Sequence, residues 1–159
     1  MRKLLLIRHA KSSHKYPHLK DHDRPLNKHG ERDRFAIGQW LAQKEKSLQI
    51  IISSTAVRSA SLAETLGQYT KVPIKLSRDL YTFDECELFE AIKHIPGKYQ
   101  NIAVIAHNPA VTEVVNYLGG DIANLPTSGI AAFECKLQSW QELSLKKCQL
   151  NYFVAPKLI

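Results

Sequence analysis

The sequence predicts an α/β protein, a three-layer αβα sandwich in which helices cover both faces of a mainly parallel sheet. Short, largely apolar runs at residues 4–7, 49–53 and 102–106 are typical of strands that are buried on both faces. Segments with helical periodicity separate these runs, and parallel strands need such crossover connections. A chain of 159 residues can bury a sizeable core, and we expect residues 1–159 to form a single domain.

The first half of the chain predicts three strands and two helices. The first apolar run is followed by a long polar connection over residues 10–27, and connections of this length are often functional. Asn27 is the expected N-cap of a helix that reaches about Glu45. After the second apolar run, Thr55 is expected to cap the next helix, and residues 73–76 predict a short peripheral strand.

The second half predicts two more helices and three more strands. Residues 85–95 have helical spacing and precede the third apolar run. Asn108 is expected to be the N-cap of the following helix, with Pro109 at the first helical position and Gly119-Gly120 at its end. The remaining sequences GIAAFECKL and QLNYFVA are typical of strands.

Composition narrows the functional classes. The formal net charge is +7, from 22 basic and 15 acidic residues, which favours an anionic partner. We expect no nucleic-acid binding, because the chain has no basic helix and no basic strand interleaved with aromatic residues. No apolar run is long enough to span a membrane, and the N-terminal run is too short for a signal peptide. We therefore expect no membrane partner and a cytoplasmic protein.

The cysteines and the histidine-rich connection predict no metal site. Cys86, Cys135 and Cys148 are widely separated, form no CxxC motif and are odd in number, so we expect free thiols. The histidines within residues 14–29 have spacings that match no common metal site, and we favour exposed side chains, with contact to an acidic partner as the alternative. The sequence predicts no metal and no cofactor.

Basic side chains follow the apolar strands at their carboxyl ends. Arg8 and His9 follow the first strand, Arg58 lies just beyond the second, and His107 follows the third. Ligands bind outside the carboxyl ends of parallel strands, so we expect these four side chains to converge. Arginine forks suit an anion with several oxygens, and two helix N-termini add backbone donors. Without an acidic cluster or a P-loop motif, the pattern favours metal-free phosphate chemistry with histidine as nucleophile.

The motifs resemble those of one known family. Arg8-His9-Ala10 resembles the Arg-His-Gly motif of the histidine phosphatase superfamily, also called phosphoglycerate mutase-like. Ala10 replaces the motif's glycine, a mild departure because many small relatives also have alanine there. Four later segments are similar, in the same order, to segments of the small SixA-type phosphohistidine phosphatases: DHDRPLNKHG (21–30), SSTAVRSASLAET (53–65), AHNPAV (106–111) and LPTSGIAAFE (125–134).

This resemblance implies a phosphoglycerate mutase-like fold and a covalent phosphohistidine intermediate. His9 would attack the phosphorus, while Arg8, Arg58 and His107 would hold the phosphoryl oxygens and neutralise the charge of the transition state. The resemblance covers nearly the whole chain, so it also implies roles for residues other than these four.

Four further residues are candidates for contact with the phosphate or the substrate. Ser12 and Ser13 would supply a hydroxyl or a backbone donor. Ser128 lies where a backbone amide meets the phosphate in the family. Arg24 would either contact the substrate or brace the connection that carries it.

A general acid is less evident. Asp84 and Glu85 are candidates, but Asp84 followed by Glu87 also fits a capping box, and we favour that role. An alkoxide leaving group needs a proton, whereas imidazole, with a pKa of about 6.5, needs little acid assistance. The absence of an evident acid therefore favours phosphohistidine over a phosphate ester.

We therefore expect a metal-independent phosphatase that hydrolyses phosphohistidine on a protein. The alternative enzyme keeps the same site and cleaves a small phosphate ester or a sugar phosphate, in which case replacing Asp84 or Glu85 would sharply lower kcat. A non-enzymatic alternative is a phosphate-binding or phosphoprotein-binding domain. Mutase activity is disfavoured because the chain lacks insertions that could enclose a bisphosphate. The expected partner is a phosphohistidine-bearing protein or a small phosphorylated molecule, and we expect a monomer or a weak dimer.

Overall fold

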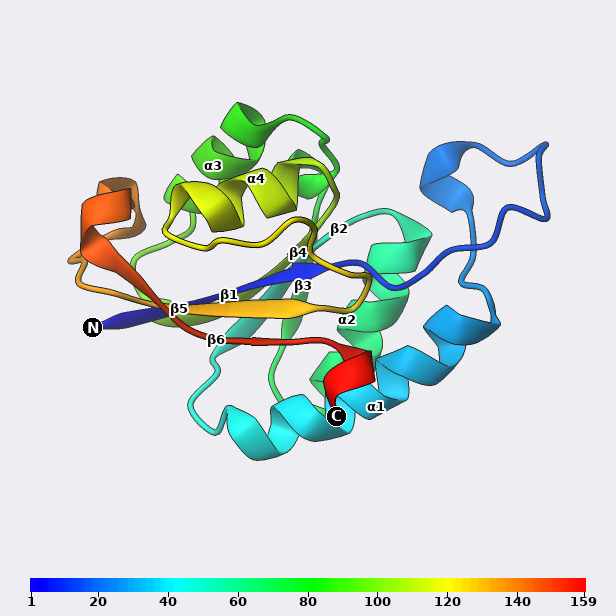
Figure 1. Ribbon diagram of the computed structural model, residues 1–159, viewed down its shortest axis with the longest axis horizontal. Helices are drawn as coiled ribbons and strands as arrows, with labels where there is room; N and C mark the ends of the chain where they lie inside the picture. Colours follow the sequence, from blue (N-terminus) through cyan, green and yellow to red (C-terminus); the bar gives the residue numbers. More distant parts are fainter.

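The computed structural model describes residues 1–159 and contains one six-stranded sheet between two layers of helices (Figure 1). The strands are β1 (Arg2–Arg8), β2 (Ile50–Ser54), β3 (Ile74–Ser77), β4 (Asn101–Ala106), β5 (Ile130–Cys135) and β6 (Cys148–Val154). The helices are α1 (Lys28–Lys44), α2 (Val57–Thr70), α3 (Glu85–Lys93) and α4 (Ala110–Tyr117). None of the helices combines the length and the apolar character that crossing a membrane requires.

The sheet is mainly parallel, as the sequence predicts. Its strand order is β3-β2-β4-β1-β5-β6, and the first four strands of this order run parallel to one another. β5 pairs antiparallel with β1, and β6 pairs antiparallel with β5. The predicted αβα class is confirmed.

Burial on both faces explains the continuous apolar sequence of the central strands. In β1, Leu4 and Leu6 belong to the apolar cluster under α3 and α4, whereas Leu5 and Ile7 belong to the cluster under α1 and α2. Successive side chains of a strand point to opposite faces, so a strand covered on both sides needs apolar residues at every position. Figure 1 shows the two helical layers on opposite sides of the sheet.

Two of the predicted helix starts differ from the structure. Asn27 caps α1 as predicted, and its Oδ1 accepts the Gly30 N–H at 2.9 Å. The prediction for Thr55 is wrong: Ala56 is the N-cap of α2, and the Thr55 hydroxyl instead contacts Nε2 of His22 at 2.8 Å. The contact comes from a residue distant in sequence, which local capping rules do not see.

The start of α4 is shifted by one residue from the prediction. Pro109 is the N-cap, so the helix begins at Ala110. Asn108 still satisfies a free helix donor, because its Oδ1 accepts the Thr112 N–H at 3.2 Å and the Thr112 hydroxyl at 2.6 Å.

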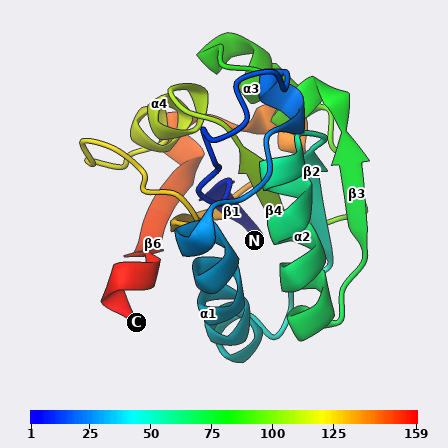
Figure 2. The ribbon, with the colours of Figure 1, turned by 90° about the vertical axis from the view of Figure 1, so that its right-hand side faces the viewer.

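The parallel strands end at the same edge of the sheet. Figure 2 looks onto this edge and shows the connection after β1 arching across it. The connection contains a short 3-10 helix, η1 (Asp21–Asp23), which packs beside α2 before the chain enters α1. The edge is therefore covered by a segment rich in polar residues.

Candidate active site

The side chains that follow β1 and β2 meet in one cavity at this edge. Its volume is about 480 Å³, and its walls come from the end of β1, the connection to α1, the first turn of α2 and the turns before α4 and β5. Arg8, His9 and Arg58 line it. The other predicted site residues that line it are Ser12, Ser13 and Arg24. His107 lies directly behind the wall and is fully buried.

Three elements hold the backbone where it leaves β1. The Arg8 N–H donates to the Gly129 carbonyl at 3.1 Å, and the His9 N–H donates to the Ala106 carbonyl of β4 at 3.1 Å. The Ala10 N–H then donates to the Arg58 carbonyl of α2 at 3.3 Å. These bonds fix the direction in which Arg8 and His9 leave the sheet, which a precisely positioned site requires.

His9 has the protonation state of a nucleophile. Its Nδ1 lies 2.7 Å from the Ala10 carbonyl oxygen, which can only accept, so Nδ1 carries the proton and donates it. Nε2 therefore keeps its lone pair. Burial lowers the pKa of His9 to about 3, with the charges of Arg58, Arg8 and Arg24 acting in the same direction against the Ala10 hydrogen bond. The ring is neutral at pH 7, as nucleophilic attack requires.

His107 packs behind His9 and contacts Arg58. The two imidazole rings have centroids 5.0 Å apart. Arg58 can only donate, so Nδ1 of His107 accepts from Arg58 at 3.3 Å, and the neutral ring donates Nε2–H to the Ser54 hydroxyl at 2.7 Å. Burial, His9 and the Arg58 charge lower the pKa of His107 to about 3.

Asp21 is a site residue that the sequence reasoning missed. Its carboxylate accepts from Arg58 at 2.9 Å, from the Tyr81 hydroxyl at 2.6 Å and from Arg24 at 3.1 Å. Burial alone would raise the pKa of Asp21, but these hydrogen bonds hold it far below its usual range. A signal was available, because Asp21 is the first residue of the DHDRPL segment that also contains Arg24.

Arg8 and Arg58, two of the three arginines that line the cavity, each have an unpartnered donor. Nε of Arg8 and Nε of Arg58 are buried without a hydrogen-bond partner. The only hydrogen bond of the Arg8 side chain is the one that it donates to the Leu125 carbonyl, at 3.1 Å. Arg2 and Arg34, which do not line the cavity, also have a buried Nε without a partner. What distinguishes Arg8 and Arg58 is that their guanidinium groups line a cationic cavity and suit a bound oxyanion.

Arg24 both lines the cavity and braces the connection. It donates to Asp21 and, at 3.3 Å, to the Ser13 carbonyl. The Ser13 N–H is taken by the Pro25 carbonyl at 2.7 Å, and the Ser13 hydroxyl accepts the Lys15 N–H at 3.1 Å. The two sides of the connection are thus tied together beside the cavity.

The backbone amide of Ser128 makes hydrogen bonds within the protein. Its N–H donates to the carbonyls of Arg8 and His9, each at 3.0 Å, and its φ of +59° lies in the left-handed region. The amide therefore closes the turn onto β1, while the neighbouring Thr127 lines the cavity. The Ser128 hydroxyl is buried and has no partner.

Asp84 and Glu85 do not line the cavity. Asp84 is the N-cap of α3 and accepts the Glu87 N–H at 3.0 Å, which is the capping role favoured above. Glu85 lies against Glu113 of α4, and partial burial and this neighbour raise the pKa of Glu85. The residue of this segment that lines the cavity is Phe83, whose ring meets the His107 ring edge-on at 5.5 Å.

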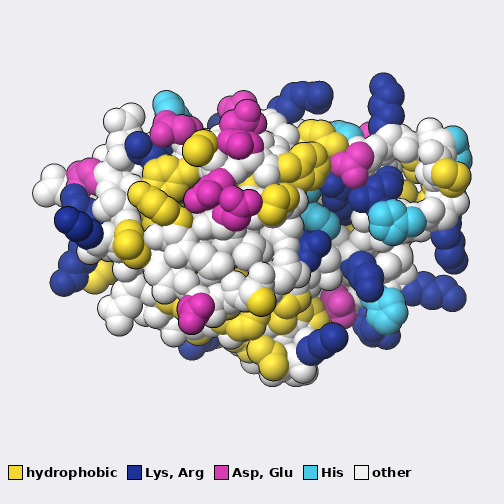
Figure 3. All heavy atoms as spheres, turned by 45° about the horizontal axis from the view of Figure 1, so that its top comes forward, with side chains coloured by type: hydrophobic (Ala, Val, Ile, Leu, Met, Phe, Trp, Pro, Cys, Tyr) yellow, Lys and Arg dark blue, Asp and Glu magenta, His cyan; other side chains and the backbone are white.

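The cavity is strongly cationic. Asp21 is the one acidic residue in its lining, against five basic residues: Arg8, Lys11, Lys15, Arg24 and Arg58. Figure 3 shows lysine, arginine and histidine side chains gathered at the end of the molecule that carries the connection. No group of three or more His, Cys, Asp and Glu side chains is arranged to hold a metal ion.

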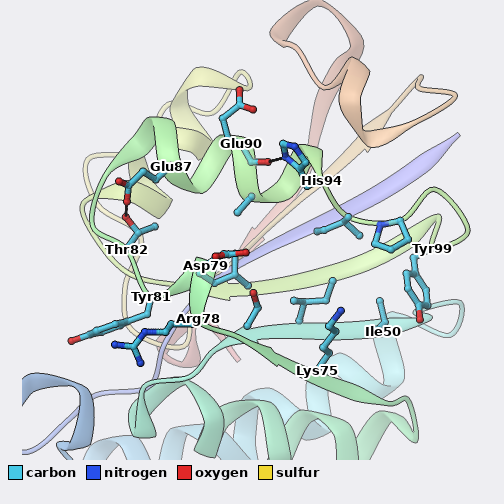
Figure 4. A pocket seen from close by; sticks show the side chains of 16 residues that line it. Ile50, Lys75, Arg78, Asp79, Tyr81, Thr82, Glu87, Glu90, His94 and Tyr99 are labelled. Carbon is cyan, nitrogen blue, oxygen red and sulfur yellow. Dashed lines mark hydrogen bonds between the residues drawn. The ribbon is translucent and has the colours of Figure 1, made fainter.

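A second, larger cavity of about 640 Å³ lies between β2, β3 and α3 (Figure 4). Acidic and basic side chains share its walls, including Lys75, Asp79, Glu87 and Glu90. Thr82 donates to Glu87 there at 2.6 Å. The charges of these walls oppose one another, and none of the residues of the cationic cavity discussed above lines it. The smaller cavity is therefore the candidate active site.

Comparison with known proteins identifies the family. Residues 4–87, more than half of the chain, match the model of the histidine phosphatase superfamily (branch 1). The chain belongs to this superfamily. The resemblance seen in the sequence is thus confirmed, and the protein is a phosphatase.

Relatives and solved structures agree along the whole chain. An uncharacterized protein of Mycobacterium leprae (strain TN) is 30% identical over 166 residues, which cover 95% of this chain and 100% of the relative. A SixA phosphohistidine phosphatase candidate from Nakamurella multipartitia has a TM-score of 0.84 at 22% identity, over 98% of this chain and 96% of its own. The protein histidine phosphatase SixA complexed with tungstate has a TM-score of 0.79 at 19% identity, over 98% and 97% of the two chains. The fold of this phosphatase is therefore that of the SixA proteins.

Proposed function

We propose that this phosphatase hydrolyses phosphohistidine on a protein, through a covalent phosphohistidine formed at His9 and without a metal ion. One observation carries the proposal. A buried, neutral His9 with its Nε2 lone pair free lines the same cavity as the guanidinium groups of Arg8 and Arg58. A nucleophile next to donors that an oxyanion can satisfy is the arrangement that phosphoryl transfer requires.

The reaction follows in two steps. Nε2 of His9 attacks the phosphorus while the bond to the substrate's imidazole breaks. The substrate ring, protonated on its other nitrogen, leaves as neutral imidazole. Arg8 and Arg58 bind the phosphoryl oxygens and neutralise their charge. Water then attacks the phosphorus and the bond to Nε2 breaks, which restores its lone pair. The oxygen and one proton of that water leave in inorganic phosphate, and its second proton passes to the solvent.

His107 has a supporting role in this scheme. Its pKa is lowered mainly by burial, and the neighbouring cation adds to this. A phosphoryl dianion beside it reverses the charge effect and favours the protonated ring. We assign to His107 the uptake of a proton when the substrate binds, which lets it donate to a phosphoryl oxygen together with Arg58.

The lining of the cavity supports phosphohistidine as the substrate. Asp21 is its one carboxylate, and the low pKa of Asp21 makes it a poor proton donor. An imidazole leaving group, with a pKa of about 6.5, needs little help from an acid. Phe83 adds an exposed aromatic wall that suits a planar ring, and the basic rim suits an acidic protein surface.

The test compares hydrolysis of a phosphohistidine-bearing protein and of p-nitrophenyl phosphate, side by side and with EDTA present. We expect turnover of the phosphohistidine protein to survive EDTA. His9→Ala should lower kcat/KM by at least about 10³-fold, because a covalent nucleophile is lost. His94→Ala is the matched control, since His94 is exposed and hydrogen-bonds only within α3, to the Glu90 carbonyl.

Four outcomes would contradict the proposal. Full turnover by His9→Ala would exclude His9 as the nucleophile. Loss of activity in EDTA would exclude the metal-free mechanism. Cleavage of the ester alone would assign the site to small phosphate esters, and binding of phosphate without any turnover would leave a binding domain.

A further inference from the structure

Two of the three cysteines face each other across the last pair of strands. Cys135 ends β5 and Cys148 begins β6, and the register of the two strands pairs them directly. Their Sγ atoms are 2.8 Å apart. This pair lies at the opposite end of β5 from the turn that borders the active site, so the proposed function does not involve it.

The register places the pair at a position where a disulfide can form. The neighbouring pair is hydrogen-bonded, since the Lys136 N–H donates to the Lys147 carbonyl at 2.8 Å. Hydrogen-bonded and non-hydrogen-bonded pairs alternate along antiparallel strands, so Cys135 and Cys148 form a non-hydrogen-bonded pair. The Cα atoms of such pairs are about 4.5 Å apart. Disulfides usually span Cα separations of about 4.4–6.8 Å, so this pair lies within reach of a disulfide.

The two thiols differ in access and acidity. Cys135 is fully buried, whereas Cys148 is only half-buried. The hydrogen bond between the sulfurs lowers the pKa of Cys148, and a hydrogen bond with the Ser144 backbone acts in the same direction. The same pairing and burial raise the pKa of Cys135. Cys148 is thus the thiol that reacts first with an external reagent, and Cys135 lies next to it, where it can attack the resulting mixed disulfide.

We propose that Cys135 and Cys148 form a reversible dithiol–disulfide couple that exchanges with low-molecular-weight disulfides such as glutathione disulfide. The Cys148 thiolate attacks one sulfur of glutathione disulfide, forms a mixed disulfide and releases one glutathione thiolate. Cys135 then loses its proton and attacks the Cys148 sulfur, which releases the second glutathione thiolate. Two protein thiols are oxidised by two electrons, one glutathione disulfide is reduced, and the two protons pass to the glutathione thiolates.

The test treats the folded chain with glutathione disulfide, blocks the remaining thiols by alkylation and analyses tryptic peptides by mass spectrometry. Cleavage after lysine places Cys135 in peptide 99–136 and Cys148 in peptide 148–157. We expect these peptides to be joined by a disulfide in the wild type, and to separate again after treatment with dithiothreitol. Cys86→Ser is the matched control and should give the same joined peptides, because Cys86 is exposed and has no partner thiol.

The two single variants report the order of the steps. Cys135→Ser should stop at the mixed disulfide, with glutathione held on Cys148. Cys148→Ser should take up no glutathione on Cys135, because Cys135 is buried. Circular dichroism of each variant checks that it is folded before the reaction. A wild type that keeps all three thiols, that stops at the mixed disulfide, or that joins Cys86 to either partner would overturn the proposal.

Discussion

At the scale of single residues, Asp21 shows how one carboxylate orders a cationic cavity. Arg58 and Arg24 carry like charges beside the same space, and both donate to Asp21. Arg58 also donates to the Asp21 backbone carbonyl at 2.7 Å, so the arginine is held at two points. The unliganded cavity thereby keeps its arginines in place, and an arriving oxyanion competes with Asp21 for some of the same donors.

This competition gives Asp21→Asn two opposite effects. Turnover should fall by up to about 10²-fold in kcat, because misplacement of a positioned group by about 1 Å has effects of this size. The affinity for tungstate, a phosphate-like oxyanion, should instead rise, because the variant removes the negative charge that competes for Arg58. Steady-state kinetics and tungstate titration measure the two effects.

Asp23→Asn is the matched control for this prediction. Asp23 lies in the same 3-10 helix, but its carboxylate contacts only His22, at 3.0 Å, and is more than half exposed. The Asp23→Asn variant should therefore have the kcat and the tungstate affinity of the wild type. Equal effects of the two variants, or weaker tungstate binding by Asp21→Asn, would show that Asp21 acts only through the stability of the connection.

At the scale of elements, local sequence signals predicted what local forces determine. The central strands are covered on both faces, so each appears in the sequence as an uninterrupted apolar run. Asn27 caps α1 through a hydrogen bond within one turn of the helix. Contacts between segments that are distant in the sequence could not be predicted from local sequence patterns. Thr55 bonds His22 from another part of the chain, and Cys135 meets Cys148 only because β5 pairs with β6.

In the candidate site, too, some features could be predicted from local sequence and others could not. The convergence of Arg8, His9 and Arg58 could be predicted from strand ends alone, because parallel strands share one edge. The choice between Phe83 and Asp84 for the cavity could not, because it depends on where α3 begins and which way its cap faces. Asp84 turns to the Glu87 N–H, and Phe83 is left to face the cavity.

The start of α1 offers a prediction about how an element supports the site. A Cβ on Gly30 would clash with the Lys11 carbonyl oxygen, a backbone atom that also accepts the Asn27 N–H at 3.0 Å. Gly30→Ala must therefore push α1 away from the segment that carries Ser12 and Ser13. We expect a loss of about 1–3 kcal/mol in the free energy of unfolding, as for other overpacked sites. Turnover should fall as well.

Urea unfolding and steady-state kinetics check this prediction against Gly97→Ala. A Cβ on Gly97 would meet nothing closer than 3.8 Å, so this variant should match the wild type in both measurements. If Gly30→Ala were as stable as Gly97→Ala, the close approach of α1 to the connection would not be a constraint on the fold.

At the scale of the whole molecule, the active site and the core have opposite effects on stability. The two apolar clusters bury the faces of the sheet, whereas the edge buries His9 and His107 in neutral form next to cations. Burying a group that would otherwise be protonated makes folding dependent on pH. The pH dependence of the free energy of unfolding should therefore show whether His9 and His107 are neutral in the folded protein, even when no substrate is present.

The direction of that dependence follows from the two pKa values. His9 and His107 titrate near 3 in the folded protein and near 6.5 when unfolded, so between these values only the unfolded chain binds the two protons. Stability must then fall as pH falls below 6.5, by about 1.4 kcal/mol per pH unit for each histidine. Asp21 does not interfere, because its lowered pKa contributes stability that is lost only below about pH 3.9, the ordinary value of an aspartate.

Urea unfolding at pH 7 and pH 5 tests this expectation, with His9→Asn and His18→Asn as a matched pair. The wild type should lose about 2 kcal/mol per buried histidine between these conditions. His9→Asn should lose about half as much as the wild type, because one of the two titrating rings is gone, whereas His18→Asn removes only an exposed ring and should behave as the wild type. Equal stability of the wild type at both values would mean that His9 and His107 take up protons between pH 7 and pH 5 in the folded protein as they do in the unfolded chain. His9 would then have the pKa of an ordinary histidine, and burial would not be what keeps its lone pair free below pH 6.5.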